Sequence, residues 1–153
     1  YGLPFAVVLL RPEHDQWLPG EHNGTFRGHN LAFVTATAAL DFWRDDHITR
    51  EVERKERVIT EHLDRIATAT GAIDRRGRGL IQGLEWSESE TAGKIAEQAF
   101  GRGLIVETAG FDGQVVKLLP ALNIPDEDLE RGLSILEESA VTVTEDALVT
   151  AGS

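Results

Sequence analysis

The sequence has 153 residues, enough for one hydrophobic core, and its 41% hydrophobic and 27% charged residues are ordinary for a soluble globular protein. A net charge of −11 argues against a surface that neutralises nucleic-acid phosphates. The absence of cysteine excludes thiol catalysis, disulfides and thiolate metal sites, and it fits a cytoplasmic location. No apolar run has the length of a membrane span, and the first residues lack the pattern of a signal peptide.

Residues 5–10 form an unbroken apolar run, Phe-Ala-Val-Val-Leu-Leu, which predicts a strand buried on both faces. Such a strand needs neighbours that the rest of the sequence does not obviously supply. The polar stretch 12–30 predicts a long loop, and loops of this length are usually functional or disordered. A helix over 31–45 follows, with Asn30 as its N-cap. Its apolar face is predicted to carry Leu31, Val34, Ala38 and Phe42.

The most regular pattern predicts a helix over 49–71, begun by Thr49 and ended by Gly71. Its apolar stripe consists of Val52, Ile59, Leu63 and Ile66. Opposite charges four residues apart predict ion pairs of Glu51 with Lys55, Glu53 with Arg57 and Glu61 with Arg65. A long charged helix with a narrow apolar stripe suits an element that crosses between two domains.

The last part of the sequence predicts a small domain with the order strand, helix, strand, strand, helix. Strands are expected over 80–86, 104–107 and 115–119. The first helix, over 87–100, is predicted to begin with a capping box of Ser87 and Glu90. The second is predicted to begin at Asp126 and to fray beyond Thr144. Its inward side chains are predicted to be Leu129, Leu133, Leu136 and Ala140.

These elements predict two pieces joined by a helix. Residues 1–48 are interpreted as the C-terminal end of a larger domain, and residues 49–71 as the linking helix. Residues 72–153 are interpreted as a small C-terminal α/β domain.

Histidines, serines and the arginine-rich segment indicate no metal, nucleophile or phosphate motif. The histidines lack a recognisable ligand spacing, so no metal is expected and they are interpreted as loop and surface residues. They are His14, His22, His29, His47 and His62. In residues 75–79 the Gly-x-Gly precedes a strand, whereas a dinucleotide-binding turn follows one, so a turn is predicted. No serine has the strand-turn context of a nucleophile elbow.

Two places could bind an anionic ligand. In the glycine-containing loop 21–30, ahead of the predicted helix, Thr25 is the residue that would pair with a phosphate, and Gly24 would let the backbone come close to it. Alternatively, the glycines serve turns and Thr25 caps locally. Lys117 lies in an apolar strand, where it either needs a counter-ion or ligand or points to a solvent face.

Two stretches resemble the class III pyridoxal-phosphate aminotransferases. Residues 23–28, Asn-Gly-Thr-Phe-Arg-Gly, are similar to the family motif Gly-Thr-Phe-Gly-Gly-Asn. Residues 115–125, Val-Val-Lys-Leu-Leu-Pro-Ala-Leu-Asn-Ile-Pro, resemble the family's last strand and the approach to its C-terminal helix. Within the family, residues 1–6, 17–28 and 107–117 resemble the subgroup that forms diaminobutyrate in ectoine synthesis, from glutamate and aspartate 4-semialdehyde.

The resemblance implies the C-terminal part of a fold type I enzyme with pyridoxal 5'-phosphate (PLP), small amino-acid and keto-acid substrates, and a homodimer or homotetramer. It implies that Thr25, next to Gly24, binds the cofactor phosphate of the neighbouring subunit. Lys117 stands where the family often has an arginine that holds the substrate carboxylate, and it keeps the charge without the planar fork. Arg27 replaces the usual second glycine and is assigned to substrate choice.

The family's chemistry also requires a lysine that forms a Schiff base with the cofactor. None of the three lysines, Lys55, Lys94 and Lys117, has the Ser-Lys context of a strand end, and Lys55 is interpreted as exposed. In the family this lysine lies just before the segment that matches Tyr1. No catalytic residue is therefore expected in these residues, and the isolated chain is expected to be inactive.

Two alternatives stay open. A non-enzymatic α/β module that binds a small molecule accounts for residues 72–150, but it leaves residues 5–10 and the Gly-Thr-Phe loop without a purpose. The other alternative, within the same class, is a transaminase of the ornithine or acetylornithine type.

Overall fold

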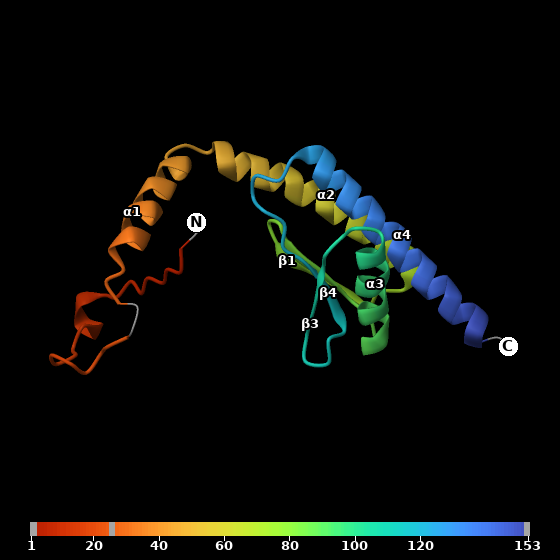
Figure 1. Ribbon diagram of the computed structural model, residues 1–153, viewed down its shortest axis with the longest axis horizontal. Coiled ribbons are helices and arrows are strands. Elements are labelled where there is room, and N and C mark those ends of the chain that lie inside the picture. Colours follow the sequence, from red (N-terminus) through yellow and green to blue (C-terminus); the bar gives the residue numbers. More distant parts are fainter. Residues whose placement is uncertain (1–2, 25–26, 152–153) are drawn as a thin grey trace. The chain divides into compact units, whose positions relative to one another are not determined.

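The computed structural model describes residues 3–24 and 27–151 (Figure 1). The chain divides into two compact units, Tyr1–Ile48 and Thr49–Ser153. Among the described helices, none combines the length and the apolar character that are needed to cross a lipid bilayer.

The first unit contains little regular structure besides helices. A short 3-10 helix, η1, spans Pro12–His14, and α1 spans Asn30–Ala39 and continues as the 3-10 helix η2, Leu40–Trp43. The predicted strand over 5–10 is wrong, because these residues form no strand and Leu9 is 91% exposed. A strand needs hydrogen-bonding neighbours, and no described residue of this unit is in a strand.

Helix α1 differs from its prediction in both its start and its buried face. It begins at Asn30 itself, with His29 as the N-cap and no side-chain hydrogen bond to the cap. The predicted inward residues Leu31 and Val34 are 68% and 67% exposed, and only the small side chains of Ala32 and Ala39 are buried in α1. Because the helix has apolar residues on all of its faces, their periodicity does not indicate which face is buried.

Helix α2, His47–Thr70, begins before the predicted cap Thr49, because Asp45 Oδ1 accepts a hydrogen bond from the backbone N–H of His47 at 3.0 Å. It ends as predicted at Gly71, which has a φ of +71°. Three members of its predicted apolar stripe, Ile59, Leu63 and Ile66, are at most 1% exposed. The fourth, Val52, is partly buried and packs against the same core.

The four-stranded sheet of the second unit is antiparallel throughout, with the order β1-β2-β4-β3. Its strands are β1, Asp74–Arg78; β2, Ile81–Glu85; β3, Glu107–Ala109; and β4, Val115–Leu118. Strand β1 replaces the predicted turn over 75–79. It lies at the sheet edge with every residue exposed, so it carries no apolar alternation that the sequence could reveal.

Helices cover one face of this sheet. Helix α3, Ser89–Gly101, packs against β3, β4 and the last helix, α4, Asp126–Ala151. The predicted capping box is not formed, because α3 has Glu88 as its N-cap and no side-chain hydrogen bond there. Helix α4 continues past Thr144 instead of fraying. Its predicted inward residues Leu129, Leu133, Leu136 and Ala140 are buried in the core.

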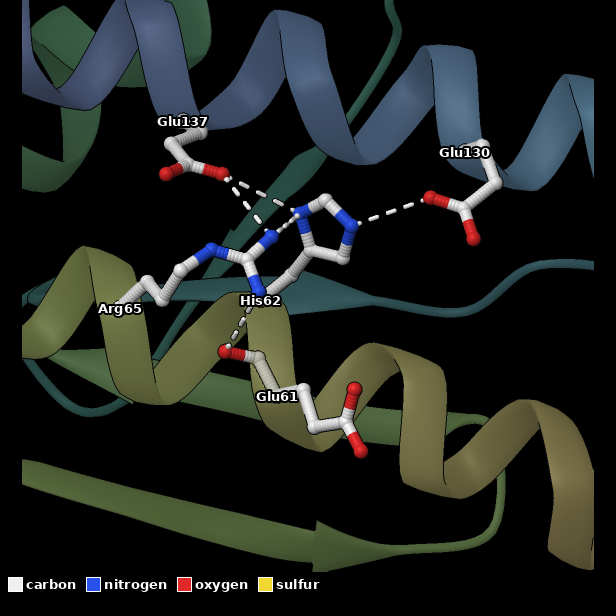
Figure 2. Close-up of polar contacts among 5 residues, drawn as sticks. All are labelled: Glu61, His62, Arg65, Glu130 and Glu137. Atoms are coloured by element: carbon white, nitrogen blue, oxygen red, sulfur yellow. Dashed lines mark hydrogen bonds and ion pairs between the residues drawn. The ribbon is translucent and has the colours of Figure 1, made fainter.

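A polar cluster joins α2 to α4, which run side by side (Figures 1 and 2). The imidazole of His62 is 12% exposed, with Nε2 3.1 Å from Glu130 and Nδ1 3.2 Å from Glu137, both carboxylates of α4. Arg65 Nη2 lies 2.7 Å from His62 Nδ1 and 3.4 Å from the Glu137 carboxylate. The interpretation of His62 as a surface residue is therefore wrong, because it lies in a helix-to-helix junction. The predicted pair of Arg65 with Glu61 is also wrong, because Arg65 reaches the Glu61 carbonyl instead.

Candidate functional site

The loop before α1 places Gly24 and Arg27 in one turn. The backbone N–H of Arg27 donates to the Gly24 carbonyl at 3.1 Å, and its guanidinium Nη1 donates to the carbonyl of His22. A Cβ on Gly24 would meet nothing within 4 Å, so the backbone is open to an approaching group. Gly28, with a φ of +77°, serves the turn into α1. The predicted phosphate ligand Thr25 lies outside the described residues.

Lys117 lies on β4 in the second unit, on the sheet face opposite the helices. Its neighbours Val116 and Leu118 point into the core, so strand alternation turns Lys117 the other way. Its ammonium lies 2.6 Å from the carboxylate of Glu107, directly opposite on β3. The Lys117 side chain is 33% exposed, so it combines a counter-ion with partial access to solvent.

The ion pair also favours the ionised form of Glu107. The hydrogen bond from the Lys117 ammonium holds the pKa of the Glu107 carboxyl below its usual range, because it stabilises the ionised form. Sequence reasoning missed Glu107 as a partner. Opposite charges on neighbouring strands are a usable signal, but the register that sets Glu107 against Lys117 follows from the turn geometry, which sequence does not give.

A pocket of about 370 Å³ lies beside this pair, between the ends of β3 and β4 and the first turns of α4. Most of its lining is apolar, including Leu104, Ile124 and Leu133, and its charged members are Glu107, Lys117 and Asp128. A largely apolar pocket that is bordered by a lysine can hold a small molecule that carries a carboxylate.

The second residue that sequence reasoning missed is Lys55. It is 5% exposed, so its interpretation as an exposed residue is wrong, and so is its predicted pair with Glu51, which instead pairs with Arg54 at 2.8 Å. Lys55 Nζ donates to the carbonyls of Ile124 at 2.8 Å and Leu122 at 3.4 Å. Its position, between Val52 and Ile59 on the apolar stripe, was the signal that predicts burial.

Comparison with known proteins identifies the class. The family model for class-III aminotransferases matches residues 1–140. The chain is 54% identical over 144 residues to the diaminobutyrate–2-oxoglutarate transaminase of Halomonas elongata, and 52% identical over 143 residues to that of Bordetella parapertussis. Each match covers 91% of this chain but only 34% and 33% of the relatives. The chain thus spans about one third of the length of the curated relatives it matches.

Solved structures give the same class. The N-acetylornithine aminotransferase from Stenotrophomonas maltophilia matches with a TM-score of 0.64 and 31% identity, over 79% of this chain and 32% of that one. The ornithine aminotransferase from Toxoplasma gondii, crystallised with partial occupancy of PLP, matches with a TM-score of 0.72 and 26% identity, over 84% of this chain and 31% of that one.

The fold and the sequence together define the family of this chain. This chain belongs to the class-III aminotransferase family, and its resemblance to the diaminobutyrate subgroup is confirmed. Its helices and small antiparallel sheet agree with the predicted C-terminal part of that fold. The division into residues 1–48, 49–71 and 72–153 stays a prediction, as do the roles assigned to individual site residues.

Proposed function

We propose that this chain is the C-terminal part of a PLP-dependent aminotransferase of ectoine synthesis. The enzyme would move an amino group between glutamate or 2-oxoglutarate and aspartate 4-semialdehyde or diaminobutyrate. The observation that carries the proposal is the 54% and 52% identity to two diaminobutyrate–2-oxoglutarate transaminases over 91% of the chain. The ornithine-type structures match at 31% and 26% identity, which favours the diaminobutyrate reaction over theirs.

The loop before α1 has donors that suit the phosphate of PLP. Gly24 leaves open space at the backbone, Thr25 adds a hydroxyl, and α1 begins a few residues later with unpaired N–H groups at its first turn. Arg27, in the same loop, is proposed to contribute to substrate choice, and its guanidinium donates to the His22 carbonyl, which holds the loop together. When bound, PLP supplies the electron sink that lets an amino group leave one carbon and enter another.

Lys117 is proposed to hold a substrate carboxylate. Its ammonium has three N–H donors, and the contact with Glu107 at 2.6 Å engages the ammonium from one side. The remaining donors are available to a carboxylate in the adjoining pocket, where apolar walls limit competition from water. An ammonium acts as a point charge, so it accepts a wider range of carboxylate orientations than the guanidinium fork.

The lysine that carries the cofactor is proposed to lie outside these residues. Lys55 is engaged by the carbonyls of Leu122 and Ile124, Lys94 by Glu90 at 3.0 Å, and Lys117 by Glu107. We therefore expect no transamination from the isolated chain. A cytoplasmic homodimer or homotetramer belongs to the same proposal, and the exposed apolar side chains of α1 support an assembly that covers them.

The test uses the full-length protein loaded with PLP. Amino transfer to 2-oxoglutarate is measured with diaminobutyrate, ornithine and N-acetylornithine as donors. We expect kcat/KM for diaminobutyrate to exceed the others by about tenfold or more, because a site built for one polar chain length leaves groups unpaired with another. A preference for ornithine or acetylornithine contradicts the substrate assignment. No transfer from any donor contradicts the enzyme itself and favours a binding module.

The role of Lys117 is tested in the same assay. Removing its charge in Lys117→Gln is expected to raise the KM for 2-oxoglutarate by about tenfold or more, because a charged hydrogen bond is lost. Lys94→Gln removes the charge of an exposed lysine on α3 and is the matched control. An equal, small effect of both substitutions contradicts the assignment of Lys117.

A further inference from the structure

The buried lysine of α2 has no part in the function described above. Lys55 is 5% exposed, and its ammonium is bound by the backbone carbonyls of Ile124 and Leu122. A buried ammonium loses the favourable free energy of its hydration. Hydrogen bonds to neutral carbonyls compensate for less of this free energy than a bond to a carboxylate does. An uncharged side chain of similar length would fill this place on the apolar stripe at lower cost. The presence of a charged group at this buried position is therefore best explained by the backbone carbonyls that it binds.

What Lys55 binds is the loop 119–125, which connects β4 to α4. Two of its apolar side chains, Leu119 and Leu122, are 60% and 42% exposed, and only Ile124, near its end, packs against the core. It contains a turn in which the N–H of Ile124 donates to the Ala121 carbonyl at 3.0 Å. The hydrogen bonds of Lys55 join the carbonyls of this turn to a different element, α2.

The neighbouring contact reinforces this attachment one residue beyond the loop. Arg54, next to Lys55 on α2, lies 2.7 Å from the carboxylate of Asp126, the first residue of α4. Arg54 is also paired with Glu51, and both carboxyls have a lowered pKa because of their hydrogen bonds with its guanidinium. Successive residues of α2 thus hold the end of the loop and the start of the next helix.

The same loop forms a wall of the pocket beside Lys117. Leu119, Pro120 and Ile124 line that pocket together with Lys117. Leu119 follows β4 directly, so a displacement of the loop also moves the end of the strand that carries Lys117. A displacement of the loop would therefore change one wall of the pocket and the end of the strand that carries Lys117.

We propose that Lys55 is a positioning residue for substrate binding, which holds the loop 119–125 so that the pocket keeps its shape and Lys117 its place. This inference rests on the proposed binding of a substrate carboxylate by Lys117. A purely space-filling role for Lys55 makes a different prediction, namely that any side chain of similar length serves equally well.

The experiment compares Lys55→Met, which keeps the length and removes the charge, with Lys55→Arg, which keeps a charged donor. Lys94→Met is the matched control on an exposed helix face. Each is made in the full-length, PLP-loaded protein, and kcat and KM for 2-oxoglutarate are measured together with hydrogen exchange of amides 121–124. We expect Lys55→Met to raise KM on the order of tenfold with little change in kcat, because the misplaced wall weakens binding. Exchange at 121–124 rises in the same variant, Lys55→Arg restores part of both, and Lys94→Met matches the wild type.

Wild-type KM and wild-type loop exchange in Lys55→Met overturn the proposal, even if that variant melts at a lower temperature, because Lys55 then only fills space. If Lys55→Met does not fold, Lys55→Gln is measured in the same way. If the wild-type protein itself shows no transamination, the proposed function has failed. Loop exchange then decides about Lys55 alone, and an unchanged rate in the variant still overturns its role.

Discussion

The two units of this chain differ in how much of their apolar surface the chain itself covers. In the second unit, three helices and a sheet enclose a core in which Ile59, Leu63 and Ile95 are at most 1% exposed. In the described part of the first unit only Ala32 and Ala39 are buried, while Leu9 is 91% exposed. The second unit thus has its own core, and the described part of the first leaves most of its large apolar side chains exposed.

The contrast extends to the proposed site. The group assigned to the substrate carboxylate, Lys117, sits on a sheet whose other face is fully packed. The residues assigned to the cofactor phosphate, Gly24 and Thr25, belong to the unit without a core. Because the relatives are about three times as long as this chain, we expect the substrate-binding part to be preformed and the cofactor-binding part to be completed by the rest of the protein.

The largest contrast is expected from removing one leucine side chain in each unit. Leu63→Ala empties space in the core of the second unit, where Leu63 is 1% exposed, and should lower the free energy of unfolding by about 2–5 kcal/mol. Leu31→Ala is the same change on α1, where the side chain is 68% exposed, and should cost about 0.5 kcal/mol or less. Urea unfolding of the 153-residue chain measures both. Equal losses would remove the distinction between the units.

A smaller effect is expected at the junction of α2 and α4. His62→Ala removes the imidazole between Glu130 and Glu137 and leaves Glu130 without this partner, whereas Glu137 keeps Arg65 (Figure 2). The loss should be about 1–3 kcal/mol, since hydrogen bonds with charged partners are lost at a largely buried position. His14→Ala, in the first unit and exposed, is the control and should change stability little. A loss no greater for His62 than for His14 would show that the cluster does not hold the helices together.

The smallest effect is a dependence on pH through Glu107. The folded chain lowers the pKa of this carboxyl, so the ionised form stabilises the fold above the unfolded pKa, and this contribution disappears as the pH falls through the folded pKa. Lys117→Gln removes the cause, so the Glu107 carboxyl should then titrate at a higher pH. Its side-chain carbon resonance, followed by NMR between neutral and acid pH, measures the midpoint. An unchanged midpoint in Lys117→Gln would show that the pair does not form in solution.

Much of the second unit could be predicted from the sequence, because its helices are amphipathic and have clear ends. The stripe of α2 and the inward residues of α4 follow from a 3.6-residue period, and Gly71 ends α2 as predicted. Strand β1 could not be predicted, because every one of its residues is exposed and its sequence therefore has no alternation of apolar and polar residues. The burial of Lys55 is missed because a charged residue is expected to be exposed, although its position on the apolar stripe indicates burial.

Less of the first unit and of the candidate site could be predicted. Residues 5–10 have the composition of a buried strand, but a strand forms only beside hydrogen-bonding neighbours, and composition cannot supply them. The pair of Lys117 with Glu107 depends on strand register, which is set by the connection between β3 and β4 rather than by either residue. The family resemblance, in contrast, rested on short motifs whose order along the chain could be read directly, and it is confirmed.

The most direct test of this account is hydrogen exchange of the same residues in two contexts, the 153-residue chain and the full-length protein. We predict that amides of α2 and α4 are protected to a similar extent in both, because their core is complete within the second unit. Amides of α1, whose apolar side chains are exposed in this chain, should exchange fast in the shorter chain and slowly in the full-length protein, where we expect these side chains to be covered. Strong and equal protection of α1 in both contexts would contradict the account.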